Sequence, residues 1–400
     1  MSESAQNVNT FQPASVRMPG ATPLPSFDQK HSICVIGAGA FGGWSALNLL
    51  RKGYQVILVD SWGGGNSRSS SGDETRVIRS SYGRNELYFD LNVRALQLWK
   101  ENELRFKKKI FYNTGVMWFC YHEQEPLVED SIPFALKHKV PLEMVTRADL
   151  KKRHPLINCE DLHHAWFDPY GGYLKARDSC AAVQQAFIDE GGVFVQQHAI
   201  PGKIDNGRMT DVVLANGQRI RADVFVFALG SWLPKVFPEV VTEHLYCTKQ
   251  EVYYFGTPQD SSVEYDNLPV WIDLDGTNFY YGIPGNNGRG FKIGVDIRGE
   301  AFDPSRSDRV SSDEVLRKAR RFLSHRFPGL QGAPMIESRV CPYENSQTGN
   351  FIFDIHPQLS NLFLLGGGSG HGFKHGPALG ELVASVINGT STCPLLFRIF

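Results

Sequence analysis

The sequence of 400 residues lacks the features of several large protein classes. It has no apolar run of about 18 residues, which a membrane-spanning helix needs, so we expect no transmembrane segment. Residues 1–31 are polar and proline-rich and lack the apolar core of a secretion signal. We interpret them as a flexible tail, with a docked arm as the alternative. The 41 Lys and Arg balance the 42 Asp and Glu, which leaves no overall field to attract nucleic acid or an anionic membrane.

Cysteine is also scarce. The seven cysteines are an odd number, are scattered, and show neither CxxC nor metal-ligand spacing. We therefore expect a reduced, cytoplasmic chain without a metal site. The sequence contains no Gly-x-Ser-x-Gly elbow, HExxH motif, P-loop or paired-carboxylate layout, so hydrolysis and phosphoryl transfer have no support. Because the chain is too long for one ordinary core, two domains are expected.

What the sequence does contain is a dinucleotide fingerprint. An apolar run leads into GAGAFG at 37–42, and Asp60 follows a second apolar run. Gly37 permits a tight turn, Gly39 lets a pyrophosphate approach the backbone, and Gly42 lets the helix pack on the strand. The phosphates would lie at the helix N-terminus, and Asp60 would accept hydrogen bonds from ribose hydroxyls. A chance loop of three glycines is the alternative, but strand, helix and acid all fall where the fingerprint requires.

The nucleotide domain is interrupted. Apolar strands at 224–229 and 362–365 each run into glycines, as strands that end beside a ligand do in doubly wound sheets. Ordinary core strands with glycine turns are the alternative. Residues 238–334 alternate like antiparallel strands, and such an interruption favours FAD over NAD. We predict an α/β fold with an α+β second domain: a Rossmann-type FAD-binding domain from 32–110, 171–237 and 336–400, and an antiparallel-sheet substrate domain from 111–170 and 238–335.

Three further clusters carry candidate chemistry. Arg76 and Arg79 are three residues apart and could face the same way, where guanidinium groups suit a carboxylate or the electron-rich edge of a flavin. Surface arginines paired with neighbouring acids are the alternative. Strand alternation places Lys292 and Asp296 on one face, as pocket residues or as a simple ion pair. The glycine-rich segment 366–376, with two histidines and a lysine, predicts backbone wrapped on a flat ligand, or else a surface loop.

Together these motifs resemble the monomeric sarcosine oxidase family of D-amino-acid-oxidase-like flavoproteins. The resemblance runs from about residue 33 to about residue 381. It rests on six segments: VIGAGAFG at 35–42, GDETRVIRSSYG at 72–83, YYGIPGNNGRGFKIG at 280–294, VCPYE at 340–344, FIFDIHP at 351–357 and GSGHGFKHGPALGE at 368–381. It implies a monomer with FAD held by a thioether from cysteine to the isoalloxazine 8-methyl group, and Cys341 is the matching position. A thiolate is the nucleophile for such a bond.

The resemblance also implies individual roles. Arg79 and Lys374 match the pair that clamps the substrate carboxylate. Arg76 matches an arginine packed against the flavin, and Lys292 matches the lysine that assists oxygen reduction through water. The tyrosines that match the substrate cavity are Tyr281 and Tyr343. The residues assigned to catalysis are Lys292, Arg76, Tyr343 and Asp296. The residues assigned to the cofactor are Gly37, Gly39, Phe41, Gly42, Asp60, Ser71, Arg76, Gly230, Trp232, Cys341, Gly368, Gly370, His371, Gly372 and Lys374.

Three departures from the family pattern surround the substrate. Asp296 stands where sarcosine-type members carry a histidine, serines 70–71 replace a His-His pair, and 284–289 replace a phenylalanine-rich segment. These changes argue against sarcosine itself and favour a larger or more polar amine. A cationic substrate is one such candidate, because Asp296 could pair with a second ammonium group.

The expected reaction is FAD-dependent oxidation of a primary or secondary amine of an amino-acid-like substrate to an imine, with oxygen as acceptor and hydrogen peroxide as product. The imine then hydrolyses in water. One alternative is a flavin dehydrogenase of a hydroxy acid or alcohol that passes electrons to a carrier, with Asp296 or His371 as base. The other is a biosynthetic tailoring flavoenzyme acting on a cyclic imino acid. The expected partners are a small amine with a carboxylate and oxygen, with no nucleic acid and no membrane.

Overall fold

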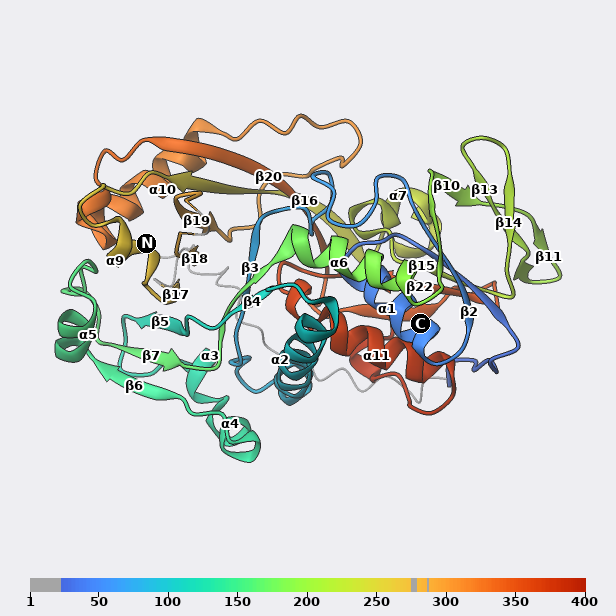
Figure 1. Cartoon of the computed structure of the whole chain (residues 1–400), viewed down its shortest axis with the longest axis horizontal. Helices are drawn as coiled ribbons and strands as arrows, with labels where there is room; N and C mark the ends of the chain where they lie inside the picture. Colours follow the sequence, from blue (N-terminus) through green and yellow to red (C-terminus); the bar gives the residue numbers. More distant parts are fainter. Residues whose placement is uncertain (1–22, 275–278, 286–287) are drawn as a thin grey trace, which may run out of the picture.

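The protein is built around two large sheets that lie side by side (Figure 1). The computed structural model describes residues 23–274, 279–285 and 288–400. The first sheet has the order β21-β22-β15-β1-β2-β9, and all neighbouring pairs are parallel except β21 with β22. Its strands are β1 (Ser32–Ile36), β2 (Gln55–Asp60), β9 (Val193–Gln196), β15 (Val224–Phe227), β21 (Ile352–Ile355) and β22 (Leu362–Gly366).

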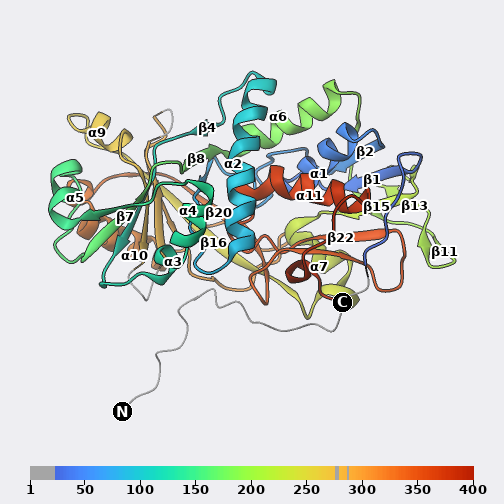
Figure 2. The same cartoon turned by 90° about the horizontal axis from the view of Figure 1, so that it is seen from below.

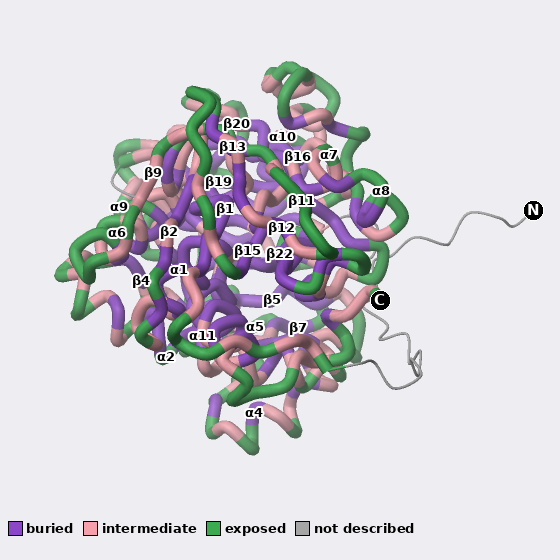
Figure 3. The backbone as a smooth tube through the Cα atoms, turned by 90° about the vertical axis from the view of Figure 1, so that its right-hand side faces the viewer, coloured by how far each residue is buried: buried purple, intermediate pink, exposed green. Residues whose placement is uncertain are grey.

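Strand β1 is covered on both faces, which explains why it is a continuous apolar run. Ile33 and Val35 join the core cluster formed with the helices, whereas Cys34 and Ile36 join the cluster on the opposite face. Figure 3 shows β1, β15 and β22 as buried central strands with exposed connections outside them. The helical layer consists of α1 (Ala40–Arg51), α6 (Ala176–Asp189), α2 (Glu86–Phe106) and α11 (Gly376–Ile387). The opposite face carries β10 (Ala199–Pro201), β13 (Asp211–Leu214) and β14 (Arg219–Arg221), beside the small hairpin of β11 (Ile204–Asp205) and β12 (Arg208–Met209).

The second sheet has the order β20-β16-β19-β18-β17-β5-β7-β6. All its neighbouring pairs are antiparallel except β17 with β5, which are parallel. The long helix α10 (Asp313–Arg326) packs on it through Ala319, Phe322 and Leu323. The strands are β5 (Val116–Cys120), β6 (Glu143–Thr146), β7 (His164–Asp168), β16 (Leu245–Phe255), β17 (Val270–Leu274), β18 (Phe279–Ile283), β19 (Phe291–Val295) and β20 (Met335–Ser346).

Strand β20 corrects one predicted boundary. The sequence placed 336–400 with the cofactor domain, but β20 pairs with β16 from Leu245 opposite Ser346 to Phe255 opposite Met335. A strand of 12 residues with a continuous partner belongs to the second sheet, so the prediction is wrong for 336–346. This placement carries Cys341 and Tyr343 from the second sheet to the border with the first.

A third, small sheet joins the two parts. It consists of β3 (Thr75–Ile78), β8 (Gly172–Lys175) and β4 (Phe111–Tyr112) in the order β3-β8-β4. Helix α2 stands between the two large sheets in both views (Figures 1 and 2). The remaining α-helices are short: α3 (Pro126–Glu129), α4 (Ile132–His138), α5 (Arg147–Arg153), α7 (Leu233–Val236), α8 (Pro238–Val241) and α9 (Ser262–Asp266).

The described end of the N-terminal segment packs on the helical layer. The Phe27 amide donates to Ile387 O at 2.8 Å, and the Tyr54 hydroxyl donates to Phe27 O at 2.6 Å. Residues 23–31 thus behave as the docked arm rather than the tail, and residues 1–22 lie outside the described part. Within that part, no helix combines the length and the apolar character that a membrane crossing requires.

Candidate cofactor cavity and active site

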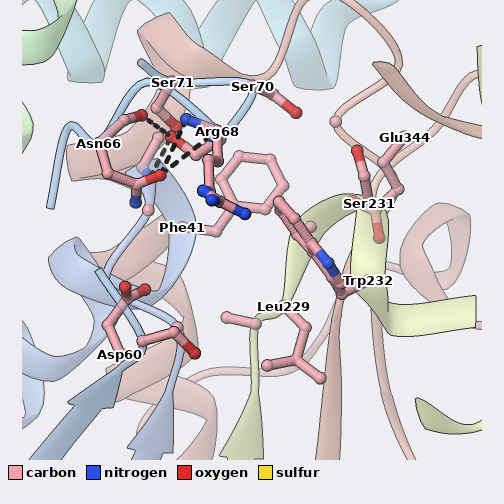
Figure 4. A pocket seen from close by; sticks show the side chains of 18 of the residues that line it. Phe41, Asp60, Asn66, Arg68, Ser70, Ser71, Leu229, Ser231, Trp232 and Glu344 are labelled. Carbon is pink, nitrogen blue, oxygen red and sulfur yellow. Dashed lines mark hydrogen bonds between the residues drawn. The ribbon is translucent and has the colours of Figure 1, made fainter. Parts of the chain in front are cut away.

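A cavity of about 490 Å³ opens where β1, β2 and β15 end (Figure 4). Its walls come from the fingerprint turn, the loop 66–71, the segment 228–232, the glycine loop 368–373 and strand β20. Ligands of open α/β sheets bind outside the carboxyl ends of the strands, and this volume lies in the range of cofactor sites. The cavity therefore occupies the position at which the fingerprint predicts a dinucleotide.

The three fingerprint glycines have the geometry that a bound pyrophosphate needs. Gly37 has φ +107°, and a Cβ there would lie 2.2 Å from Ala228 O. A Cβ on Gly42 would lie 1.9 Å from Gly37 O, so only glycine lets α1 start against this turn. A Cβ on Gly39 would approach only Ser71 Oγ, at 3.6 Å, because this residue borders the cavity. The turn thus leaves open space at the N-terminus of α1, where the Ala40 amide donates to Ser71 Oγ at 3.3 Å.

Asp60 ends β2 at the cavity wall and organises the turn around itself. Its Oδ2 accepts from the Ala38 amide at 2.8 Å, and its Oδ1 accepts from the amides of Trp62 and Gly63, both at 2.8 Å. A carboxylate oxygen can accept about two hydrogen bonds. Oδ2 therefore keeps capacity for a ribose hydroxyl.

Arg76 projects from β3 into the space between the cavity and Cys341. Its Nη1 donates to Asp73 Oδ2 at 2.6 Å, and its Nη2 donates to Ser70 O at 2.6 Å and to Cys341 Sγ at 3.5 Å. Burial lowers the pKa of Arg76, but the Asp73 carboxylate, together with Cys341, Tyr281 and Tyr343, outweighs burial and leaves this pKa raised. A fixed cation thus lies against the buried Cys341 sulfur.

Asp73 also forms an ion pair with Lys292. The Lys292 ammonium donates to Asp73 Oδ2 at 2.5 Å and to Thr75 O at 2.9 Å. Burial, together with the nearby Arg76, lowers the pKa of Lys292 more than Asp73 raises it. Conversely, Lys292 and Arg76 outweigh burial and lower the pKa of Asp73. The ion pair between Lys292 and Asp296 that strand alternation allowed is therefore wrong: Lys292 pairs with Asp73, and Asp296 follows the end of β19.

Arg79, which is half-buried, and Lys374, which is buried, bring two cations to one aromatic ring. The guanidinium carbon of Arg79 lies 4.5 Å from the ring centroid of Tyr82 and 5.0 Å from that of Trp118. The Lys374 ammonium lies 5.3 Å from the Tyr82 centroid and donates to His371 O at 2.9 Å. Across 23–274, 279–285 and 288–400, no Asp or Glu oxygen lies within 4.0 Å of either cation. Burial lowers the pKa of both.

Arg76 and Arg79 do not face the same partners, contrary to the sequence expectation. Arg76 contacts Asp73 and Cys341, whereas Arg79 contacts Tyr82 and the backbone of Ser81. The reason is that Arg76 lies within β3, while Arg79 lies one residue beyond the end of that strand. One arginine therefore borders the cofactor cavity and the other supplies a separate cationic pocket.

Asp296 already has cationic side chains of the protein around it, whereas the sequence suggested that it could pair with an ammonium group of the substrate. Its Oδ1 is 3.5 Å from Nη1 of Arg298. Burial raises the pKa of Asp296, and Arg298, Arg79 and Lys374 only partly offset this effect. This surrounding positive charge disfavours a second ammonium group on the substrate.

Two glycines make room for the predicted substrate-cavity tyrosines. A Cβ on Gly294 would lie 2.3 Å from Cζ of Tyr281, and a Cβ on Gly370 would lie 2.7 Å from Cε2 of Tyr343. Burial raises the pKa of both tyrosines, so their hydroxyls stay protonated at neutral pH. Tyr343 lines the cofactor cavity, and the Arg298 guanidinium lies 5.9 Å from its ring centroid.

Most residues assigned to the cofactor line the cavity. His371 does not: its ring stacks on Phe351 at 4.9 Å and bonds to Gly349 O at 3.0 Å, behind the glycine loop. Gly42, Cys341 and Lys374 are also absent from the lining, although Cys341 contacts Arg76. The assigned residues that line it are Gly37, Gly39, Phe41, Asp60, Ser71, Arg76, Gly230, Trp232, Gly368, Gly370 and Gly372.

Sequence reasoning missed several residues of this site. Glu344 lines the cavity, Asp73 anchors two cations, and Tyr82 and Trp118 flank Arg79. Glu344 lies in a strand that also contains Glu337, Ser338, Arg339, Asn345 and Ser346, so its local sequence gave no signal. For the two aromatic residues no local signal existed, because their approach to Arg79 depends on tertiary packing.

The seven cysteines are all free thiols, and no metal centre is visible in the described part of the chain. Cys34, Cys120, Cys159, Cys180 and Cys341 are buried. Among the described residues, no three His, Cys, Asp or Glu side chains are placed to hold a metal ion.

Two solved structures share the fold. L-Proline dehydrogenase from P. horikoshii superimposes with a TM-score of 0.79 at 20% identity, over 91% of this chain and 94% of that one. Amadoriase II from Aspergillus fumigatus, a fructosamine oxidase, superimposes with a TM-score of 0.77 at 20% identity, over 93% of this chain and 90% of that one.

Two curated sequences are similar over nearly their whole length. Monomeric sarcosine oxidase from Bacillus sp. (strain B-0618) is 28% identical over 88% of this chain and 91% of its own length. N-Methyl-L-tryptophan oxidase from Yersinia pestis (strain Pestoides F) is 25% identical over 88% and 94%, respectively. The profile of the family described as FAD dependent oxidoreductase (DAO) matches residues 32–386. With the cavity and the fingerprint geometry, this match shows that the chain belongs to the DAO family of FAD-dependent oxidoreductases.

Proposed function

We propose that this protein oxidises a primary or secondary amine of an amino-acid-like substrate to an imine, with oxygen as final acceptor and hydrogen peroxide as product. The observation that carries this proposal is the pair of cations formed by the half-buried Arg79 and the buried Lys374, with no carboxylate oxygen within 4.0 Å of either among the described residues. Buried charges are costly unless they are paired. A substrate carboxylate supplies the missing partner.

The cavity fits FAD, and residues of this chain are placed to bind the pyrophosphate, the ribose and the flavin ring. The amides at the start of α1 would bind the pyrophosphate, and Asp60 would bind the ribose. The flavin ring would lie at the end of the cavity formed by Arg76 and Tyr343. When bound, FAD supplies the two-electron acceptor for the reaction.

We propose that Cys341 links the flavin covalently. Its sulfur lies 3.5 Å from Nη2 of Arg76, and a neighbouring guanidinium is a setting that stabilises a reactive thiolate. The other six cysteines have no such contact with an arginine side chain in the described part of the chain.

The substrate's amine must be neutral before its neighbouring carbon can lose a hydride. Arg79 and Lys374 hold the carboxylate and thereby orient the substrate, which lowers the entropic cost of reaching the reactive geometry. The same cations disfavour an ammonium group nearby and so favour the neutral amine. Asp296, which lies near both, limits this effect without cancelling it.

Lys292 has a separate role in the oxygen half of the reaction. Its buried ammonium, on β19, is fixed by Asp73 just before β3 and by Thr75 at the start of β3, next to Arg76. Preorganised positive charge in a dry site stabilises negative charge as it develops on oxygen. The resemblance assigns a lysine at this position to that task.

The substrate class follows from chemistry shared with the relatives. Sarcosine and N-methyl-L-tryptophan both carry a secondary amine beside a carboxylate, and these are the substrates in the relatives' names. We therefore propose an N-alkyl or primary amino acid, a monomeric enzyme, and a cytoplasmic location that matches the seven free thiols.

A peroxide assay tests the reaction type. Air-saturated enzyme is mixed with primary and secondary amino acids, cyclic imino acids and 2-hydroxy acids, and peroxide is measured beside flavin reduction. We expect peroxide in a one-to-one ratio to oxidised amine. Flavin reduction without peroxide would assign a dehydrogenase, and turnover of hydroxy acids alone would exclude amine oxidation.

A further inference from the structure

Arg68 is an arginine of the cofactor cavity that has no carboxylate partner. Of the two arginines that line the cavity, Arg76 donates to Asp73 Oδ2 at 2.6 Å. The Arg68 guanidinium has no Asp or Glu oxygen within 4.0 Å in the described part of the chain. In Figure 4 its side chain extends from the loop 66–71 into the pocket, toward Trp232. The cavity wall thus carries a positive charge that the protein itself does not neutralise.

Two tryptophan rings keep the Arg68 side chain at this wall. The guanidinium carbon lies 4.9 Å from the ring centroid of Trp62, and the rings of Trp62 and Trp232 pack with centroids 5.3 Å apart. Both tryptophans line the cavity, and Trp62 is 41% exposed, so the stack forms the outer edge of the cavity. The Trp232 indole is fixed in turn, because its Nε1 donates to Ser305 Oγ at 3.0 Å. An exposed arginine that stacks on an aromatic ring loses part of its conformational freedom before any ligand arrives.

The backbone of Arg68 has a separate support from the segment 303–309, which lies between β19 and α10. Arg309 donates through Nη2 to Arg68 O at 3.0 Å. Figure 1 shows the chain before α10 (orange) extending toward α7. Lys235 of α7 holds the segment there, since its Nζ donates to Asp303 Oδ1 at 2.7 Å. Side chain and backbone of Arg68 are therefore both positioned in advance, which lowers the entropic cost of binding a ligand.

The part of a dinucleotide that comes within reach of Arg68 is its diphosphate. The Ala40 amide donates to Ser71 Oγ at 3.3 Å, so the loop that carries Arg68 lies against the N-terminus of α1. The fingerprint geometry calls for a diphosphate at that terminus. Both phosphate groups are negatively charged, and the planar fork of a guanidinium matches phosphate oxygens in a bidentate way.

We propose that Arg68 binds the diphosphate of the cofactor through its guanidinium group, held ready by Trp62 and Arg309. Arg68 thereby adds a side-chain contact to the backbone amides of the glycine turn. It closes the outer side of the cavity over the diphosphate. An arginine that only packed on Trp62 would leave the affinity for FAD unchanged when replaced.

The test measures flavin affinity and needs no amine, so its result is independent of the proposed amine oxidation. Full-length Cys341→Ala protein is the parent, because a covalent link would hide the affinity. Flavin-free protein is titrated with FAD at about 0.01 M and about 1 M salt, where the screening length falls from about 30 Å to about 3 Å. The variants are Arg68→Gln, Arg68→Lys and the matched control Arg306→Gln. Arg306 is an exposed arginine of the segment 303–309 that does not line the cavity.

We expect Arg68→Gln to raise the dissociation constant about ten- to a hundredfold at low salt, which is the range for losing hydrogen bonds to a charged group. The effect should shrink at high salt, and Arg68→Lys should fall between Arg68→Gln and the parent. Arg306→Gln should bind FAD as the parent does. Arg68→Gln that binds FAD as tightly as the parent at low salt would overturn the proposal. So would equal weakening by Arg68→Gln and Arg306→Gln, because that result leaves only the overall positive charge of the region.

Discussion

Replacing Asp73 by asparagine should destabilise the protein by about 3–5 kcal/mol at neutral pH, the range for breaking a buried ion pair by removing one partner. Asp73 is 1% exposed and contacts Arg76 at 2.6 Å, Lys292 at 2.5 Å and the Tyr254 hydroxyl at 2.8 Å. Asparagine keeps the shape but leaves two buried cations without their carboxylate. The loss of stability should therefore exceed the loss caused by breaking any exposed ion pair on the surface.

The assay is urea unfolding followed by circular dichroism, with the flavin content of the purified protein as a second readout. Glu160→Gln is the matched control, because Glu160 forms an ion pair with Lys151 in which both side chains are about two-thirds exposed, at 66% and 67%. We expect no measurable change in the control. A loss below about 1 kcal/mol for Asp73→Asn would refute the reasoning, since it would mean that the cations do not depend on this carboxylate.

The pH dependence of the Asp73 cluster has a definite sign. Burial raises the pKa of Asp73, but Lys292 and Arg76 outweigh it and lower this pKa below its ordinary value of 3.8. The stability that the cluster contributes is therefore present above that ordinary value and is lost as pH falls through the lower folded pKa. The difference between wild type and Asp73→Asn should accordingly be undiminished at pH 5.

Three further predictions follow from the site. Flavin should remain attached to wild-type protein after acid precipitation and be absent from the Cys341→Ala precipitate; free flavin in the wild-type supernatant would exclude the covalent link. Lys292→Met should slow reoxidation of the flavin by oxygen at least tenfold more than its reduction by substrate in stopped-flow traces, and equal slowing would remove its assigned role. Burial raises the pKa of Glu344 from 4.5 to about 7, so protein without flavin should lose up to about 3 kcal/mol of stability as pH rises from about 4.5 to about 7, at about 1.4 kcal/mol per pKa unit; Glu344→Gln should lack this loss in urea unfolding, and an identical pH profile would contradict the raised pKa.

Local pattern predicted the cofactor half of the molecule well. The fingerprint glycines at 37–42 act through backbone geometry within a few residues, so their spacing alone defined the turn at the end of β1. The interrupted α/β architecture was also predictable, because its strands end in recognisable glycines at 230 and 366. The DAO family match and the two related folds agree with it.

The substrate half depended on contacts that no local pattern encodes. Arg76 and Arg79 diverge because β3 ends between them, and Lys292 reaches Asp73 across 219 residues of sequence. The edge strand β20 was assigned to the wrong sheet, since its register with β16 is a tertiary property. Asp296 was recognisable as unusual, but the cations around it were visible only in the structure.

The most direct test of the account is anaerobic reduction of the bound flavin by matched pairs of N-methyl amino acids and their methyl esters. The two members of a pair carry the same amine and differ in the charge that Arg79 and Lys374 are proposed to bind. We expect the acid to bleach the flavin absorbance and the ester to do so at least a hundredfold more slowly at equal concentration. In the Arg79→Ala variant, the rate of flavin reduction by the acid should fall to the rate observed with the ester. Equal reduction by acid and ester, or reduction by none of the amines, would contradict the claim that this site oxidises amino acids.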